Sequence, residues 1–202
     1  MNGSLLVVSG PSGSGKSSLC RKLCEDFDFA YLSVSTTTRT ARIGEREGKD
    51  YFFTSKEAFS AAIDRGEFLE WANVHNNYYG TSRSRVESAL KDGKTVVFDI
   101  DVQGQAAIVK LFANETTSVF VTAPSNAILK ERLEKRGADD PEAIQKRLKN
   151  ALDEMQSIGA YDYLLINDSF EKSLETLKAL ALASRIKRDK VELRKFIAEW
   201  LS

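Results

Sequence analysis

The sequence predicts a three-layer α/β sandwich with a central parallel sheet, and three observations lead to this prediction. A short apolar run at residues 4–9 leads through a glycine-rich turn into a helical pattern at 15–26. The run Thr95–Asp101, TVVFDID, is apolar until its carboxylates, as expected of a central parallel strand that is buried on both faces. Apolar runs and helical patterns alternate along the rest of the chain, which favours parallel strands with helices on both faces of the sheet.

Each expected strand of the central sheet is a short apolar run, and these runs lie at residues 4–9, 30–34, 95–101, 119–122 and 163–166. The expected helices cover residues 15–26, 82–92, 102–112, 125–158 and 170–201. We expect an interruption at 137–141, where glycine and proline punctuate a polar loop, and a break near Asp189. Two helices joined by such a loop are suited to close over a site, so we interpret about 125–158 as a helical lid.

The segment 33–53, SVSTTTRTARIGEREGKDYFF, is polar, basic and rich in hydroxyl groups. It begins at the end of a predicted strand, where the ligand sites of α/β folds lie, so we interpret it as a binding segment. After it we expect a helix from the N-cap Ser55 to Gly66, a strand at 68–74, a turn at 75–77 and a returning strand. The predicted domains are therefore a core of residues 1–34 and 83–202 and a small mostly-β insertion of residues 35–82.

Size and charge limit the classes of function. A chain of 202 residues suits one α/β domain with small insertions, and its formal net charge of zero gives no overall basic field for nucleic acid. No apolar run has the length of a membrane span and the N-terminus lacks signal-peptide features, so we expect a cytoplasmic protein. Cys20 and Cys24 lie four residues apart on a predicted helix, a spacing that suits buried thiols better than a disulfide.

The stretch Gly10–Ser17, GPSGSGKS, matches the phosphate-binding loop pattern G-x-x-x-x-G-K-[ST] between a strand and a helix. Its glycines allow a tight backbone with positive φ, so that N–H groups point at phosphate oxygens beside the positive end of the next helix. Lys16 adds a charge for the β and γ phosphates, and the Ser17 hydroxyl is placed to bind Mg²⁺. The loop predicts nucleoside triphosphate binding.

Two acids follow the central apolar run. Asp99 and Asp101 lie two residues apart on a predicted extended segment, so we expect their side chains to point the same way. One of them, Asp99, suits a Walker B role toward Mg²⁺ through water, and the other is then free for a substrate group.

Arginines form two groups along the chain. Arg39 and Arg42 share a loop with hydroxyl donors, and together with Tyr51 and Tyr79 they suit a second, smaller phosphate. A further group comprises Arg132 and Arg136, on one helix face, and Arg147 on the next helix. The sequence supports equally two interpretations of this group: neutralisation of phosphates in transit, or surface salt bridges with Glu131 and Glu134. His75, the only histidine, falls in a predicted turn, and an anionic phosphate acceptor requires no general base.

Eight motifs follow one another over nearly the whole chain: GPSGSGKSSL, SVSTTTRTAR-x-GE, GKDYFF, FLEW, NNYYGT, FDIDVQG, ERLEKRG and IND. In order and spacing they resemble those of guanylate kinases, a family of phosphate-loop nucleoside monophosphate kinases. The resemblance implies phosphorylation of GMP to GDP by ATP with Mg²⁺, which recycles GMP and supplies guanine nucleotides. It also implies that the core binds ATP, the insertion binds GMP and the lid closes.

The resemblance assigns roles residue by residue. It implies that ATP is bound by Gly10, Pro11, Ser12, Gly13, Ser14, Gly15, Lys16, Ser17, Ser18 and Asn167. It also implies that the metal is bound by Ser17 and Asp99. By the same resemblance, the phosphate of GMP is bound by Ser35, Arg39, Arg42, Tyr51 and Tyr79. Its guanine is bound by Glu70, Thr81 and Asp101. The catalytic residues are Lys16, Arg132, Arg136 and Arg147. Ala41 replaces a proline that is common in the family, which makes this loop less rigid.

Elementary chemistry agrees with a guanine reader at Glu70. Guanine presents N1–H and N2–H₂ as adjacent donors for one carboxylate, whereas adenine would leave the carboxylate facing a lone pair. The alternatives are a kinase for another small phosphorylated substrate, a non-catalytic guanylate kinase-like binding module, which typically lacks the phosphate loop, and a guanine-nucleotide switch protein, whose N-K-x-D motif is missing here. We expect ATP, GMP and dGMP as ligands, no nucleic acid or membrane partner, and a monomer or homodimer.

Overall fold

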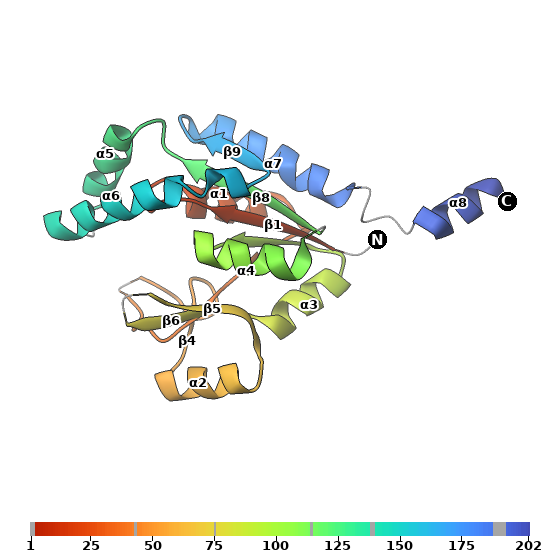
Figure 1. Ribbon diagram of the computed structural model, residues 1–202, viewed down its shortest axis with the longest axis horizontal. Coiled ribbons are helices and arrows are strands. Elements are labelled where there is room, and N and C mark those ends of the chain that lie inside the picture. Colours follow the sequence, from red (N-terminus) through yellow and green to blue (C-terminus); the bar gives the residue numbers. More distant parts are fainter. Residues whose placement is uncertain (1–2, 43, 75, 114, 138–139, 188–192) are drawn as a thin grey trace.

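The computed structural model describes residues 3–42, 44–74, 76–113, 115–137, 140–187 and 193–202. Its centre is a five-stranded sheet in the order β2-β7-β1-β8-β9, in which every neighbouring pair is parallel (Figure 1). The strands are β1 (Ser4–Ser9), β2 (Ala30–Ser33), β7 (Thr95–Asp99), β8 (Thr116–Thr122) and β9 (Tyr163–Ile166). The parallel α/β fold predicted from the sequence is confirmed.

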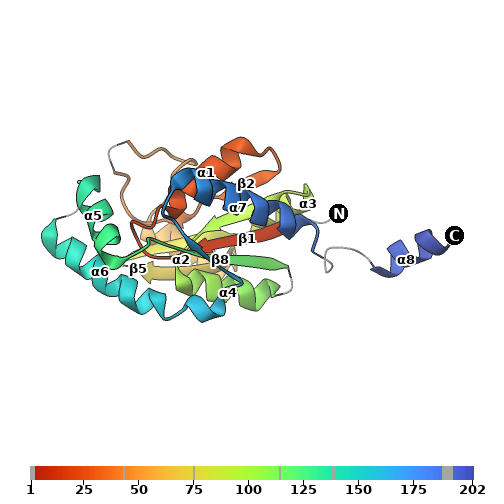
Figure 2. The same ribbon diagram turned by 90° about the horizontal axis from the view of Figure 1, so that it is seen from above.

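Helices cover both faces of this sheet, as Figure 2 shows. On one face α1 (Lys16–Asp26) and α7 (Phe170–Arg185) bury leucines such as Leu23 and Leu177 against the sheet. On the other face α3 (Arg83–Lys91) and α4 (Val102–Phe112) pack on the alternate residues of β1 and β7. Each fully buried leucine stabilises the fold by roughly 1.5–3 kcal/mol, and all residues of β1 are buried. The core therefore has the continuous apolar strands of a doubly covered sheet.

A second sheet lies below the first in Figure 1, in the order β4-β3-β6-β5. Its strands are β3 (Thr36–Thr37), β4 (Phe52–Phe53), β5 (Phe68–Val74) and β6 (Asn77–Ser82), and α2 (Lys56–Asp64) covers it. The predicted hairpin is present as the antiparallel pair β5 and β6, and Ser55 caps α2 by accepting from Ala58 N at 3.1 Å. Phe59 of α2 stacks on Phe68 with ring centroids 4.4 Å apart, which joins helix and sheet.

The predicted lid consists of α5 (Asn126–Arg136) and α6 (Pro141–Met155). These helices share a separate apolar cluster, which includes Leu129, Leu133 and Leu148. Gly137 ends α5 at φ 63°, and Asp140 begins α6 by accepting from Ala143 N at 2.8 Å. Residues 138–139, at the predicted interruption, lie outside the described residues.

Three boundaries differ from the prediction by two residues or more. The strand after residue 95 ends at Asp99 and not at Asp101, because Asp101 caps α4, with Oδ1 accepting from Gln103 N at 3.0 Å and Gly104 N at 2.8 Å. The expectation that the strand continues to Asp101 is therefore wrong. Strand β8 begins at Thr116, three residues early, because its first side chains are buried hydroxyls that an apolar pattern misses.

The third difference concerns a helix. α6 ends at Met155, and the predicted continuation to Ile158 is instead a turn that leads into the short 3₁₀ helix η1 (Ile158–Ala160). α7 ends at Arg185 and α8 covers Leu193–Leu201, while Asp189, the predicted break, lies outside the described residues, as does His75 of the predicted turn. Within the described ranges, no helix is both long and apolar enough to span a bilayer.

Candidate active site

The phosphate loop joins β1 to α1, and its geometry requires glycine at two positions. At Gly10, with φ 136°, an added Cβ would lie 2.0 Å from the carbonyl oxygen of Val121, and at Gly15, with φ 91°, it would lie 2.4 Å from Asn167 Nδ2. Ser14 N donates to Pro11 O at 3.1 Å and closes the curl. Glycine at these two positions allows the tight backbone of a loop whose N–H groups can face an anion at the start of α1.

Asn167 supports this loop from behind. Its side chain is 4% exposed, and Nδ2 donates to Ser14 O at 2.8 Å. Among the described residues, Asn167 Oδ1 and Ser14 Oγ are buried without a hydrogen-bond partner, so the loop keeps unused bonding capacity. Arg132 donates from Nη2 to Asn167 O at 2.9 Å, which places this predicted lid arginine beside the support of the loop.

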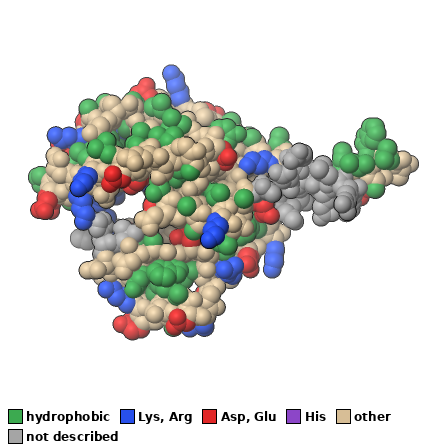
Figure 3. All heavy atoms as spheres, in the orientation of Figure 1, with side chains coloured by type: hydrophobic (Ala, Val, Ile, Leu, Met, Phe, Trp, Pro, Cys, Tyr) green, Lys and Arg blue, Asp and Glu red, His purple; other side chains and the backbone are tan. Residues whose placement is uncertain are grey.

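A cavity of about 820 Å³ opens in front of the loop. Figure 3 shows it as a hollow between the lid helices and the second sheet. Its walls come from the phosphate loop, the carboxyl ends of β2 and β7, the segment 33–51 and α6. Ligand sites of open α/β sheets lie at this end of the strands.

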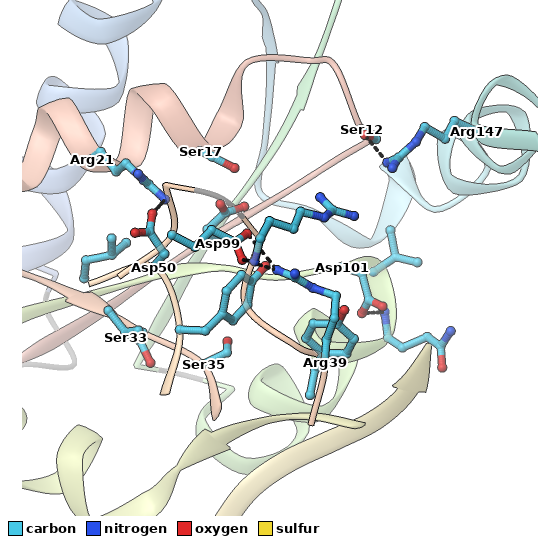
Figure 4. Close-up of a pocket in the computed structure, with 18 of the residues that line it drawn as sticks. Ser12, Ser17, Arg21, Ser33, Ser35, Arg39, Asp50, Asp99, Asp101 and Arg147 are labelled. Carbon is cyan, nitrogen blue, oxygen red and sulfur yellow. Dashed lines mark hydrogen bonds and ion pairs between the residues drawn. The ribbon is translucent and has the colours of Figure 1, made fainter. Parts of the chain in front are cut away.

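The predicted metal residues line the cavity together. Ser17 lies in the first turn of α1 and Asp99 ends β7, and Figure 4 shows both at the cavity. Lys16 lines the cavity wall beside them. A hydroxyl and a carboxylate are oxygen donors of the kind that Mg²⁺ accepts, and Mg²⁺ usually takes its remaining ligands from phosphate and water. In the described part of the chain, no cluster of three or more His, Cys, Asp or Glu side chains is placed to hold a metal ion. The residues thus fit Mg²⁺ that arrives with a nucleotide.

Arg39 is held in a fixed position at the acceptor end of the cavity. Its Nη2 donates to both oxygens of Glu45, at 2.7 and 2.9 Å, and its Nη1 donates to Thr40 O at 2.8 Å. The guanidinium carbon lies 5.2 Å from the centre of the Tyr51 ring. The hydrogen bonds from Arg39 lower the pKa of Glu45, so this carboxylate stays charged and orients the guanidinium. Sequence reasoning did not assign a role to Glu45, although it is the acid of the R-x-GE motif.

The other acceptor residues gather around Arg39. Ser35, Arg42 and Tyr79 line the same cavity, and Arg42 N donates to Glu45 at 2.8 Å. The rings of Tyr51 and Tyr79 are 5.9 Å apart. Burial raises the pKa of Tyr51, so its hydroxyl is a hydrogen-bond donor at neutral pH. The residues predicted to bind a second phosphate therefore lie together along one cavity.

The predicted base reader forms across the hairpin. Glu70 of β5 is the register partner of Thr81 of β6, and Thr81 Oγ1 donates to Glu70 Oε1 at 2.5 Å. An added Cβ at Gly104 would lie 3.5 Å from Glu70 Oε2, so the first turn of α4 lies close to this carboxylate. Burial raises the pKa of Glu70, the Thr81 hydrogen bond opposes that shift, and the charge of Asp101 adds to it.

The lid contributes two of its three predicted arginines to the cavity wall, Arg136 and Arg147. Arg147 Nη1 donates to Ser12 Oγ at 2.8 Å, which connects α6 to the phosphate loop. Glu131 and Glu134, the alternative partners, pair instead with Lys135 at 2.6 Å and Lys130 at 3.8 Å.

Glu154 of α6 is a further acid that sequence reasoning did not single out. It lines the cavity near Lys16, and burial raises its pKa while the Lys16 charge opposes the shift. Its only signal in the sequence is its place one residue before the end of a helix that carries Arg147, which is too general to identify a role.

Comparison with known proteins places this geometry in a family. The family model for guanylate kinase matches residues 2–184. The guanylate kinase of Wolinella succinogenes is 50% identical over 200 residues, which cover 99% of this chain and 93% of that protein. The guanylate kinase of Helicobacter pylori is 51% identical over 185 residues, which cover 91% of this chain and 89% of that protein.

A solved structure agrees with the sequence relatives. The crystal structure of guanylate kinase from Anaplasma phagocytophilum has a TM-score of 0.81 and 33% identity, and the match covers 97% of this chain and 94% of that one. The shared fold thus extends over nearly the whole of both chains. On the family match, the sequence identities and the shared fold, the chain belongs to the guanylate kinase family.

Proposed function

We propose that this protein transfers the γ-phosphoryl group of ATP to GMP, forming ADP and GDP. The observation that carries the proposal is that one cavity joins a triphosphate loop to a second anion site beside a base-reading carboxylate. Membership of the guanylate kinase family supports the same reaction.

The donor is held by residues 10–18, with Ser18 exposed at the start of α1, and by Asn167 acting through Ser14. Lys16 neutralises the β and γ phosphates as charge moves between them. Ser17 and Asp99 would hold Mg²⁺, which when bound supplies further neutralisation of the phosphate oxygens. Together these groups stabilise the departing ADP oxygen.

The acceptor GMP enters with its phosphate toward Arg39, Arg42, Tyr51, Tyr79 and Ser35. Two guanidinium groups suit bidentate binding of a phosphate monoester, and the tyrosine hydroxyls add neutral donors. Glu70, Thr81 and Asp101 then face the guanine edge, where N1–H and N2–H₂ need acceptors. These contacts involve base and phosphate only, so dGMP is an acceptor as well.

The transfer itself needs no general base, because the attacking oxygen of GMP is already anionic. That oxygen forms a bond to the γ-phosphorus while the bond from this phosphorus to the bridging oxygen of ADP breaks. Arg136 and Arg147 neutralise the phosphoryl group in transit, and Arg132 joins them when the lid closes and its bond to Asn167 O is exchanged. The cytoplasmic location and the monomer or homodimer state stay predictions from sequence.

A coupled assay that measures ADP formation tests the proposal, with ATP–Mg²⁺ and each of GMP, dGMP, AMP, CMP and UMP. We expect turnover with GMP and dGMP and little with the other three. Better turnover with a non-guanine acceptor would support a kinase of another phosphorylated substrate. No turnover with any acceptor would indicate a non-catalytic binding module.

A further inference from the structure

An ion pair crosses the cavity from the phosphate-loop helix to the acceptor segment. Arg21 lies on α1, one turn after Ser17, and its Nη2 is 2.7 Å from Asp50 Oδ1. Figure 4 shows the pair beside Ser17 and Asp99, while the contact of Arg147 with Ser12 lies at the other side of the same cavity. Residues at i and i+4 share a helix face, so α1 presents Ser17 and Arg21 to the cavity together.

Asp50 is well fixed on its side of the pair. Its Oδ2 accepts from Arg46 N at 2.9 Å and its own N–H donates to Arg46 O at 3.0 Å, which closes a tight turn. The Asp50 side chain is only 12% exposed. The hydrogen bond from Arg46 N, together with Arg21, lowers the pKa of Asp50, so its carboxylate stays charged.

This turn leads directly into the acceptor phosphate site. Gly48 N donates to Tyr51 O at 2.8 Å, and Tyr51 lies between Arg39 and Tyr79. A shift of the turn therefore displaces Tyr51, and with it the guanidinium that lies over its ring.

We propose that Arg21 is a positioning residue for the acceptor: through Asp50 it anchors the segment that carries Tyr51 to the helix that carries the donor site. Arg21 acts through Asp50, and this role rests on the proposed function. The pair fixes the distance between the two phosphate sites before GMP binds, so its loss weakens GMP binding more than it affects ATP. Because Arg21 is half exposed, the effect decreases as salt rises.

Arg21→Gln, Asp50→Asn and the double variant test this assignment by steady-state kinetics. Asparagine keeps an oxygen for Arg46 N and removes only the charge, so the turn itself survives. We expect each single change to raise KM for GMP about three- to tenfold, with a much smaller change in kcat and in KM for ATP. The double variant is expected to be no worse than either single one, because both remove the same contact. Arg21→Lys keeps the charge and is expected to recover most of the loss.

The matched control is Lys22→Gln, the next residue on the same helix. Lys22 pairs with Asp26 at 2.6 Å, within α1 and away from the cavity, so its loss is expected to leave KM for GMP unchanged. Thermal unfolding of all variants checks that the fold is kept. Additive effects in the double variant, an equal rise in both KM values, or an unchanged KM for GMP in Arg21→Gln would each overturn the proposal.

Discussion

Replacing Glu70 by glutamine removes a charge from the base reader while keeping its shape. In the structure Thr81 Oγ1 donates to Glu70 Oε1 at 2.5 Å, so this oxygen already has one partner. Guanine presents two neighbouring donors, and the carboxylate can accept one on each oxygen while keeping the bond from Thr81. Burial is the main cause of the raised pKa of Glu70. Because the site is partly desolvated, a hydrogen-bond partner lost there is not readily replaced by water, and the unpaired group costs free energy.

Neither orientation of the glutamine amide satisfies guanine. If its oxygen keeps the bond from Thr81, its N–H₂ group faces a guanine donor. If the amide turns round, its N–H₂ can donate to the Thr81 hydroxyl, but only one acceptor atom remains for guanine. The loss is one charge-assisted hydrogen bond and one unpaired donor, roughly 2–4 kcal/mol, or about thirty- to a thousandfold in kcat/KM for GMP.

The assay is steady-state kinetics of Glu70→Gln beside Glu67→Gln. Glu67 is a neighbouring acid whose side chain is 51% exposed and pairs with Arg65 at 2.6 Å, away from the cavity, so its loss is expected to change kcat/KM by less than about twofold. AMP use is expected to stay low in both variants, since glutamine creates no adenine-shaped pattern of donors. Equal, small effects of the two substitutions on GMP would refute the reasoning and move the guanine reader elsewhere.

Further substitutions and pH test the remaining parts of the site. Lys16→Ala is expected to lower kcat at least about a hundredfold with the fold intact by circular dichroism, because loss of one charge-stabilising group in a dry site costs on the order of 3 kcal/mol; near-normal turnover would contradict it. Arg136→Ala is expected to lower kcat more than it raises KM for GMP, and the converse pattern would assign this arginine to the acceptor site. Gly10→Ala is expected to destabilise the protein in thermal unfolding by more than about 2 kcal/mol, because its Cβ would meet Val121 O, and an unchanged midpoint would contradict the loop geometry. As pH falls, kcat/KM for GMP is expected to decrease at a higher pH than an exposed glutamate would give, because the pKa of Glu70 is raised and its charged form is lost earlier. The control is the pH profile of Glu70→Gln. If that variant loses activity over the same acidic range, the loss belongs to the GMP phosphate, which titrates near pH 6.

The sequence predicts those parts of the site that depend on local chain geometry. A strand, a glycine turn and a helix dictate the phosphate loop, and the glycines proved necessary at positions 10 and 15. The predicted hairpin is present as well, and in it Glu70 lies opposite Thr81.

Contacts between distant side chains were not predictable in the same way. Arg39 with Glu45, Arg21 with Asp50, and Arg132 with the Asn167 carbonyl depend on long, flexible side chains whose partners are chosen by tertiary packing. A helical wheel places Arg132 and Arg136 on one face, yet Arg136 lines the cavity and Arg132 bonds to the support of the phosphate loop. Sequence spacing indicates that two side chains share a helix face, whereas the position of each guanidinium group depends on its hydrogen-bond partners.

Asp101 contributes both to the fold, as the cap of α4, and to the proposed recognition of guanine. Its Oδ1 satisfies two backbone N–H groups that the first turn of α4 would otherwise leave without partners, so the helix begins at Val102 and not later. Asp101 and Glu70 both contribute to the cavity wall. The same turn contains Gly104, which lies close to Glu70 Oε2. Because α4 packs on the central sheet through Ile108, the core positions Asp101, whereas Glu70 and Thr81 are positioned by the hairpin of β5 and β6.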